Sequence, residues 1–376
     1  MPEKGWVTAG SGGFIGKNLC VTLENVDGIE VLRFDAERTE EDLKHLCQET
    51  DFVFHLAGVN RPPREEDHDT INRGLTETLL SILDELKRPI PVLLSSSTQA
   101  LFDNPYGKSK HLAEDFVFDW GKKNKVPVYV YRFPNVFGKW CKPNYNSVVA
   151  TWCHAIARGK PIRIDDPTKT LPLVYIDHVV TEMIKAMKGN PTLDCDGYGI
   201  VPVTFSVTLA DIARRLSAFH DSRSTLNLPD CSDLFDKCLY ATYLSYLPED
   251  AFSYPLTTHS DHRGSFTEFL RTPERGQVSV NVSKPEITKG NHWHHTKSEK
   301  FLVVSGKGLI CFRKLGEERI IEYKVSGEKL EVVDIPTGYT HSLVNTGDID
   351  LVTIMWVNEC FDPDNPDTYY LEVDRS

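Results

Sequence analysis

The sequence contains no Cys-x-x-Cys pair, no long hydrophobic run and no excess of basic residues. Its nine cysteines are scattered and odd in number, which argues against a disulfide framework and against a zinc site built from thiolates. No uninterrupted apolar stretch approaches the roughly 20 residues that a membrane-spanning helix needs. The first residues lack the basic and apolar regions of a signal peptide. We therefore predict a cytoplasmic protein whose thiols stay reduced and which has no membrane partner.

Acidic residues outnumber basic residues by 54 to 42, which gives a formal net charge of −12. A broad nucleic-acid-binding surface needs clustered Lys and Arg, so we predict no nucleic-acid partner. A local basic pocket for one phosphorylated small molecule is compatible with this charge. The length of 376 residues favours two domains.

Short apolar runs alternate with amphipathic stretches in the first half of the chain. The runs "GWVTAG", "IEVLRF", "TDFVFHLAG", "PVLLSSS" and "VPVYVYRF" are typical of buried strands, each leading into a loop or a helix-like segment. Strand, helix and strand in alternation imply right-handed crossovers. We predict an α/β domain over residues 1–248, with a doubly wound parallel sheet of the Rossmann type.

The pattern changes after about residue 250. The runs "GQVSVNVSK", "EKFLVVSGKGLICFRK" and "KLEVVDIPTG" are rich in β-formers and are separated by Gly, Pro and Asp turns. Evenly spaced short strands favour a sandwich or a jelly-roll barrel. We predict a second, all-β domain over residues 249–376.

A glycine pattern, Gly10-x-x-Gly13-x-x-Gly16, follows the first strand and opens a helix that begins near Phe14 and Ile15. A dinucleotide pyrophosphate can approach bare backbone N–H groups and the positive helix terminus at such a turn. The pattern alone is weak evidence, because a tight turn can produce it. Its position between a strand and a helix favours a nucleotide site.

Two cofactors are compatible with the end of the second strand. Asp35 could accept a hydrogen bond from a ribose diol, which favours NAD, whereas Arg33 and Arg38 could pair with the 2′-phosphate of NADP. Any of these side chains could instead be ordinary surface charge. The position of Arg33 at the strand end favours NADPH.

The stretch "SSSTQALFDNPYGKSK" places Tyr106 and Lys110 four residues apart, after a strand that ends in Ser95–Ser97. Residues at this spacing share one face of a helix. Ketone reduction needs a proton donor at the oxygen, and a phenol donates more readily when an ammonium stabilises its anion. An exposed helix pair is the alternative, but the preceding glycine turn makes that reading weaker.

Together, "GSGGFIG", "HLAG", "SSS", "YGKSK" and "RFPNVFG" resemble the extended short-chain dehydrogenase/reductases that modify nucleotide sugars. The resemblance implies a catalytic Ser97, Tyr106 and Lys110. Of these three, Ser97 is the least firmly assigned, because it is one of three adjacent serines. It also implies a sugar pocket. The sequence departs from the family pattern at the end of the first strand, where Ala9 stands in place of the usual Thr. The implied cofactor-binding residues are Gly10, Gly13, Phe14, Ile15, Gly16, Arg33, Leu56, Ala57 and Lys110. The implied substrate-binding residues are Asn135, Lys139 and Asn144, with Asn146 beside them, and loop polarity would also explain these four.

A second cluster, "GNHWHHTKSE", places His292, His294 and Glu299 close together, and His341 follows far downstream. Imidazole and carboxylate ligands suit zinc and other transition metals. Because alternate residues of a strand share a face, His292 and His294 should point the same way. The two halves resemble the paired motifs of cupins, although their glycines are displaced. His295 could replace His294 as a ligand.

The metal could be structural, or it could act on a ketone while a base removes the neighbouring proton. His295 and Tyr339 are the two candidate bases. An oxygen-using dioxygenase is another possible cupin chemistry.

The whole chain resembles bifunctional capsular-polysaccharide enzymes that fuse such a reductase to a cupin. The resemblance rests on motifs such as "RFPNVFGKWCKPNYNSV", "DIPTGYTHSLVNTG" and "MWVNECFDPDNPDTY". It implies C3 epimerisation of a UDP-2-acetamido-2,6-dideoxy-4-ketohexose in the cupin domain. NADPH-dependent C4 reduction would then give UDP-2-acetamido-2,6-dideoxy-L-talose, on the route to UDP-N-acetyl-L-fucosamine. Zinc and a homodimer are also implied. The alternative is a single-site reductase with a non-catalytic cupin module for dimerisation or sensing.

Overall fold

The computed structural model describes residues 6–58 and 73–374. The chain divides into two compact units. The α/β unit comprises Met1–Ser217 and Asp230–Glu249, and the β unit comprises Ala218–Pro229 and Asp250–Ser376. Residues 59–62 of the motif "HLAGVNRP" lie outside the described residues.

The α/β unit is built on a five-stranded parallel sheet in the order β2-β1-β3-β4-β5. Its strands are β1 (Trp6–Ala9), β2 (Val31–Phe34), β3 (Phe52–His55), β4 (Val92–Ser97) and β5 (Val128–Phe133). Its helices are α1 (Phe14–Glu24), α2 (Glu40–Glu49), α3 (Gly74–Glu85), α4 (Pro105–Asn124) and α6 (Ile176–Met187).

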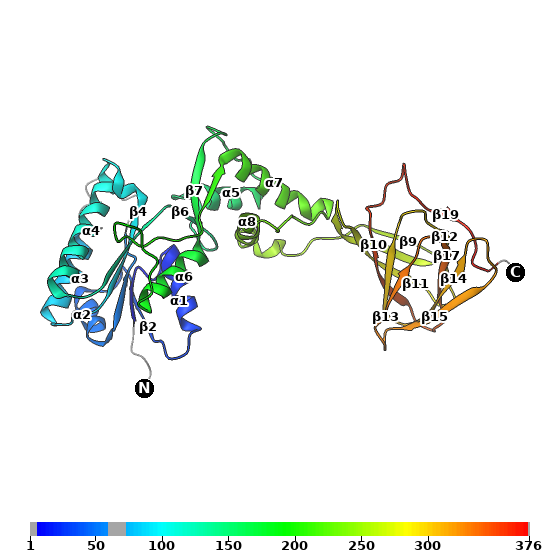
Figure 1. Ribbon diagram of the computed structural model, residues 1–376, viewed down its shortest axis with the longest axis horizontal. Helices are drawn as coiled ribbons and strands as arrows, with labels where there is room; N and C mark the ends of the chain where they lie inside the picture. The colour runs from blue at the N-terminus through cyan, green and yellow to red at the C-terminus, as the bar shows by residue number, and fades with distance from the viewer. Residues whose placement is uncertain (1–5, 59–72, 375–376) are drawn as a thin grey trace. The chain divides into compact units, whose positions relative to one another are not determined.

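Alternating side chains of the strands form two cores, one on each face of this sheet. Val92 and Leu94 pack with residues of α2, α3 and α4, whereas Leu93 between them packs with residues of α1 and α6. Figure 1 shows the two groups of helices on opposite faces. This period of two is what a strand buried on both faces requires. The predicted doubly wound Rossmann sheet is confirmed.

A smaller sheet and three helices complete the α/β unit. The sheet pairs β6 with β7 in parallel and β7 with β8 antiparallel. The elements are β6 (Asn135–Phe137), α5 (Val148–Ile156), β7 (Thr170–Tyr175), β8 (Phe205–Thr208), α7 (Leu209–Thr225) and α8 (Leu234–Leu244). The last turns of α7 belong to the β unit.

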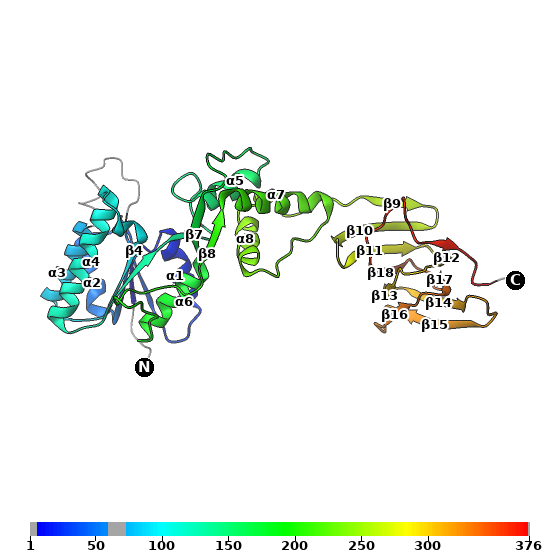
Figure 2. The ribbon, with the colours of Figure 1, turned by 45° about the horizontal axis from the view of Figure 1, so that its top comes forward.

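The β unit contains two antiparallel sheets, drawn in yellow to red in Figure 2. The six-stranded sheet follows the order β16-β13-β18-β11-β10-β9, and the five-stranded sheet follows β15-β14-β17-β12-β19. The first six strands are β9 (Thr258–Asp261), β10 (Gly264–Thr272), β11 (Gly276–Ser283), β12 (Thr288–Trp293), β13 (Glu299–Ser305) and β14 (Lys307–Lys314). The remaining strands are β15 (Ile320–Ser326), β16 (Val332–Ile335), β17 (Tyr339–Asn345), β18 (Leu351–Val357) and β19 (Tyr369–Tyr370).

The core of the β unit joins inward-facing residues from both sheets, such as Phe301 and Val303 of β13 with Ile310 of β14 and Leu343 of β17. Two packed antiparallel sheets of this kind agree with a cupin-like domain. The predicted fold class, Rossmann followed by an all-β jelly roll, is therefore confirmed for both parts of the chain. Within the described ranges, none of the helices combines the length and the apolar character that crossing a membrane would need.

Candidate active sites

The glycine turn lies between β1 and α1, as predicted. Gly10 has φ +89°, and a Cβ there would lie 2.8 Å from the backbone nitrogen of Ala57. A Cβ on Gly16 would overlap the carbonyl oxygen of Gly10. Glycine is therefore required at both positions, which hold the helix terminus against the strand ends.

The first turn of α1 can receive an anion. Gly13 occupies its N-cap, and no side chain within the described ranges caps it. The leading N–H groups of the helix, which include those of Phe14 and Ile15, lack partners from the helix itself. Leu56 and Ala57 follow the end of β3 beside this turn, where Leu56 N–H donates to the Ala9 carbonyl at 2.9 Å. These residues fit the pyrophosphate of a dinucleotide.

Asp35 and Arg33 at the end of β2 have partners of their own. The Asp35 carboxylate accepts hydrogen bonds from the Ser11 hydroxyl and, at 2.7 Å, from Gly12 N–H. Arg33 forms an ion pair of 2.5 Å with Glu24, and both side chains are about half exposed. An exposed pair of this kind contributes little to stability, so it can exchange for a ligand phosphate.

Tyr106 lies in the first turn of α4. Asn104 caps this helix by accepting a hydrogen bond from Gly107 N–H at 2.8 Å, and Pro105 is its first residue. A Cβ on Gly107 would overlap the carbonyl oxygens of Gln99 and Phe102. The glycine after the tyrosine therefore lets the start of α4 press against the short helix that follows β4.

Lys110 is one turn further along α4 and is buried. Its Nζ donates to the carbonyl oxygen of Ser95 at 3.0 Å. Burial lowers the pKa of Lys110 to about 8, although the nearby Glu114 carboxylate raises it. Lys110 thus has an ammonium whose charge changes close to neutral pH.

Sequence reasoning missed a buried charge network behind Lys110. Glu114 is fully buried, accepts from the Ser96 hydroxyl, and accepts from Arg132 Nε at 3.0 and 3.1 Å. The Tyr198 hydroxyl accepts from Arg132 at 2.8 Å. The Lys-x-x-x-Glu spacing on α4 could have indicated that Glu114 lies near Lys110. The partner Arg132 could not be found in this way, because it lies on the strand β5.

The serine triplet separates into different roles. Ser96 is committed to Glu114, whereas the Ser95 carbonyl accepts from Lys110. Ser97 ends β4, and its hydroxyl oxygen accepts from Gln99 N–H at 3.2 Å. That contact leaves the hydroxyl hydrogen of Ser97 available to a ligand.

The three predicted sugar-binding residues lie on β6 and the loop after it. Asn135 donates to the Pro172 carbonyl at 3.2 Å, and Lys139 forms an ion pair of 2.7 Å with Asp177. Asn144 has φ +55°, and its N–H donates to the Thr151 hydroxyl at 3.0 Å. Both side-chain contacts lie on exposed groups, so a ligand can replace them.

In the β unit, His292, His294, Glu299 and His341 come together. One donor atom from each lies within 4.8 Å of every other, although the four residues come from three strands and a strand end. Glu299 Oε2 lies 3.4 Å from His294 Nε2 and 3.2 Å from His341 Nε2. These three atoms are buried and have no hydrogen-bond partner within the described part of the chain. Buried nitrogen and oxygen atoms that lack hydrogen-bond partners and converge on one point are suited to bind a metal ion.

Strand pairing explains the cluster. His292 on β12 lies directly opposite His341 on β17, after a bulge near Gly290. Trp293 points away and stacks on Tyr369, and the exposed His295 packs against both rings. His294, not His295, therefore faces the other three donors.

The electrostatics keep the donors ready for a cation. Burial, with help from His341, lowers the pKa of His292 to about 4, so its imidazole stays neutral at pH 7. Burial alone would raise the pKa of Glu299, but the close imidazoles of His294 and His341 lower it below its usual range. Burial lowers the pKa of His294, but its contacts with Glu299 and the Asp367 carbonyl outweigh burial and raise it. Metals bind neutral imidazole and ionised carboxylate, which His292 and Glu299 supply directly, whereas His294 must release a proton when it is charged.

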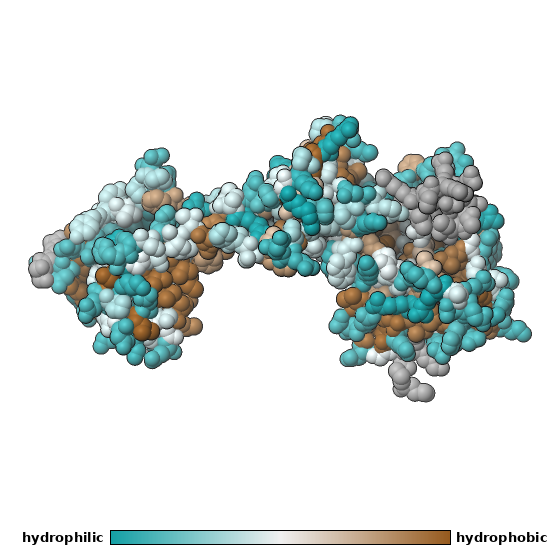
Figure 3. All heavy atoms as spheres, turned by 180° about the vertical axis from the view of Figure 1, so that it is seen from behind, coloured by the Kyte–Doolittle hydropathy of each residue, from teal (hydrophilic) through white to brown (hydrophobic). Residues whose placement is uncertain are grey.

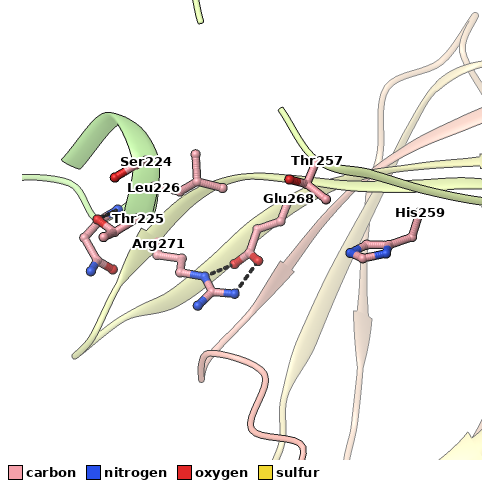
Figure 4. A pocket seen from close by; sticks show the side chains of 8 residues that line it. Ser224, Thr225, Leu226, Thr257, His259, Glu268 and Arg271 are labelled. Atoms are coloured by element: carbon pink, nitrogen blue, oxygen red, sulfur yellow. Dashed lines mark hydrogen bonds and ion pairs between the residues drawn. The ribbon is translucent and has the colours of Figure 1, made fainter. Parts of the chain in front are cut away.

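The β unit also has a pocket of about 480 Å³, lined by residues at the end of α7 and on β9 and β10 (Figure 4). Arg271 reaches into it but is already paired with Glu268 through two hydrogen bonds of 2.5 and 2.6 Å. None of the residues predicted from the sequence lines this pocket.

Comparison with known proteins follows this division into two units. Residues 6–194 match the NAD dependent epimerase/dehydratase family, and residues 259–369 match the polysaccharide biosynthesis C-terminal domain. Among solved crystal structures, the capsular polysaccharide assembling protein CapF from Staphylococcus aureus is 52% identical in sequence to this chain. The match covers 98% of this chain and 99% of that one, with a TM-score of 0.93. The chain belongs to the CapF family.

A second match is an enzyme of Pseudomonas aeruginosa, UDP-2-acetamido-2,6-beta-L-arabino-hexul-4-ose reductase. It is 42% identical over 98% of both chains. The Bordetella bronchiseptica enzyme WbmF in complex with NAD⁺ covers 65% of this chain and 92% of its own. At 20% identity and a TM-score of 0.54, WbmF shares the fold with the CapF family.

Proposed function

We propose that this chain is a bifunctional nucleotide-sugar enzyme. The cupin domain, residues 249–376, epimerises C3 of a UDP-2-acetamido-2,6-dideoxy-4-ketohexose. The Rossmann domain, residues 1–248, then reduces C4 with NADPH and gives UDP-2-acetamido-2,6-dideoxy-L-talose, on the route to UDP-N-acetyl-L-fucosamine. The strongest support is the cluster of buried, orphaned metal donors in a chain that also carries the Tyr106–Lys110 pair. The activity in the name of the Pseudomonas aeruginosa relative supports the reduction.

In the reductase site the bound nicotinamide supplies the hydride. The glycine turn binds the pyrophosphate, and Arg33 binds the 2′-phosphate of NADPH once it leaves Glu24. Ser97 donates a hydrogen bond to the C4 ketone oxygen, and Tyr106 donates the proton that this oxygen gains. The Lys110 ammonium stabilises the Tyr106 anion that is left. Asn135, Lys139 and Asn144 bind the sugar nucleotide.

In the cupin site, His292, His294, Glu299 and His341 would hold zinc. Such an ion polarises a carbonyl oxygen as a Lewis acid. Tyr339 lies two residues before His341 on β17 and packs against the core, whereas His295 is exposed outside the cluster. Because Tyr339 and His341 share one face of β17, Tyr339 in its phenolate form is the better placed of the two bases to take the C3 proton.

Epimerisation must precede reduction, because the C4 ketone is what acidifies the neighbouring C3–H. Once the ketone is reduced, the C3 proton is no longer acidic. The two activities on one chain can therefore run only in this order.

Hydrogen exchange in D₂O tests the first step without the second. Wild-type protein incubated with the UDP-linked 4-keto sugar and no NADPH should exchange the C3 proton for deuterium, which NMR follows directly. A C3 signal that persists in zinc-loaded, folded protein would leave the alternative reading, a reductase with a non-catalytic cupin module. Oxygen uptake by an iron-loaded protein would instead favour a dioxygenase.

The charge of Lys110 should set the alkaline limit of reduction. Because the pKa of Lys110 is lowered to about 8, the ammonium is largely present at pH 7 and is lost as pH rises through 8. The value of kcat/KM for reduction, which reports the free enzyme, should therefore fall above about pH 8. In Lys110→Arg the guanidinium stays charged, so this fall should move to higher pH. An unchanged alkaline limb in Lys110→Arg would contradict this role.

The outer face of the six-stranded sheet is suited to form the interface of a homodimer. Val280, Ile354 and Leu302 lie side by side on three adjacent strands and are half-buried. Figure 3 shows hydrophobic side chains gathered on the surface of the β unit. Light scattering measures the mass of the particle in solution, which we expect to be twice the chain mass of 42.6 kDa.

A further inference from the structure

His294 receives less support from its own strand than the other donors of the cluster. His292 lies between two paired strands, opposite His341 on β17 and Tyr370 on β19. β12 ends at Trp293, so His294 lies one residue beyond the sheet. Its side chain is nevertheless buried, with only 3% exposed. A contact outside the strand must therefore hold it.

Asp367 supplies that contact. His294 Nδ1 lies 2.6 Å from the backbone carbonyl oxygen of Asp367. A carbonyl oxygen can only accept, so Nδ1 carries the hydrogen, and in the neutral ring Nε2 therefore keeps its lone pair. Nε2 is the atom that faces Glu299. The contact thus selects the tautomer that a metal needs.

The carboxylate of the same residue holds the segment that follows His294. It accepts hydrogen bonds from the backbone N–H groups of His295, Thr296 and Lys297, at 3.0, 2.9 and 2.9 Å. The Thr296 hydroxyl donates a fourth at 3.2 Å. Charge-assisted bonds of this kind are stronger than neutral ones, so the segment is fixed by one residue.

Asp367 is itself anchored on both sides. On one side, the Lys297 ammonium donates to the Pro366 carbonyl. On the other, β19 pairs with β12, and the buried Arg313 donates to the carbonyls of Glu372 and Val373 at 2.5 and 2.7 Å. Residues 366–373, here called the C-terminal strap, therefore contact the end of β12, the segment after it and β14.

We propose that Asp367 is a positioning residue for the metal cluster. Its carbonyl orients the His294 ring, and its carboxylate fixes the backbone that carries this ring. This role rests on the proposed metal site. Partners that orient a metal ligand typically change metal affinity by about 10- to 100-fold when they are removed.

Asp367→Ala removes the carboxylate and keeps the backbone carbonyl, so it tests whether the carboxylate holds this carbonyl and the His294 backbone in place. Asp364→Ala is the matched control. Both variants remove one carboxylate from the same segment, but Asp364 is exposed and lies outside the contacts with residues 294–297. We expect competition with a chromophoric chelator to show zinc affinity about 10- to 100-fold weaker in Asp367→Ala and unchanged in the control. The visible spectrum of the Co²⁺-loaded protein should also change in Asp367→Ala, because His294 is displaced from the ion.

Asp367→Asn covers the case in which the alanine variant does not fold. One acceptor oxygen remains in Asn, so zinc affinity should lie between wild type and Asp367→Ala, and Asp364→Asn is its control. Equal zinc affinity and equal Co²⁺ spectra in the Asp367 and Asp364 variants would overturn the positioning role alone. A wild-type protein that binds neither ion would overturn the proposed metal site and this role with it.

Discussion

Replacing Tyr106 with phenylalanine is expected to slow ketone reduction by about 10²- to 10⁴-fold, the usual contribution of a positioned general acid. The substitution removes only the hydroxyl from the first turn of α4 and leaves the Asn104 cap and the Lys110 contact with Ser95 in place. The proton that the C4 oxygen gains then has no donor. Single-turnover oxidation of NADPH with the 4-keto sugar measures the loss.

Tyr129→Phe is the matched control, since it removes a phenol from β5 of the same unit. It should reduce the ketone at nearly the wild-type rate. Exchange of the C3 proton in D₂O should survive in Tyr106→Phe, because that step belongs to the other unit. If Tyr106→Phe keeps most of the reduction rate, another group donates the proton. If it also loses exchange, the two steps share one site.

His341→Ala is expected to reduce C3 exchange by about 10³-fold, whereas Tyr106→Phe should spare this exchange. His341 is 1% exposed, lies opposite His292, and contacts Glu299 at 3.2 Å, so its loss removes one of four converging donors. Lewis-acid stabilisation is worth several kcal/mol, and about 4 kcal/mol corresponds to this factor. Metal content and the NMR exchange rate are the two measurements.

His295→Ala provides the comparison for His341→Ala. His295 is a neighbouring histidine whose ring packs on Trp293 and Tyr369, away from the cluster. We expect it to keep its metal and its exchange activity. Reduction of substrate that has already been epimerised should persist in both variants. Exchange that survives in His341→Ala but disappears in His295→Ala would make His295 the base and leave the metal without a catalytic role.

Local spacing was sufficient for the parts of the sites that lie on one element. The four-residue spacing of Tyr106 and Lys110 predicted a shared helix face, and the glycine turn was placed correctly between a strand and a helix. Strand alternation predicted that His292 and His294 would point the same way, and both rings do join the cluster. These features depend on helix and strand periods, which a sequence displays directly.

Contacts that depend on strand order could not be predicted in the same way. The choice between His294 and His295 stayed open because it is decided beyond the end of β12, by Asp367, which lies 72 residues after His295. The burial of Glu114 likewise depends on Arg132, which β5 brings beside α4. Nothing near either residue in the sequence indicates its partner.

The C-terminal strap gives the proposed metal site an order of assembly during synthesis. Domains fold as they leave the ribosome, the N-terminal one first, so the parallel sheet can close before β12 has been made. His292, Glu299 and His341 can then pair, but the His294 tautomer is not set until residues 366–373 have also emerged. A nascent chain that lacks residues 366–373 therefore has the four proposed ligands without the contact that orients His294.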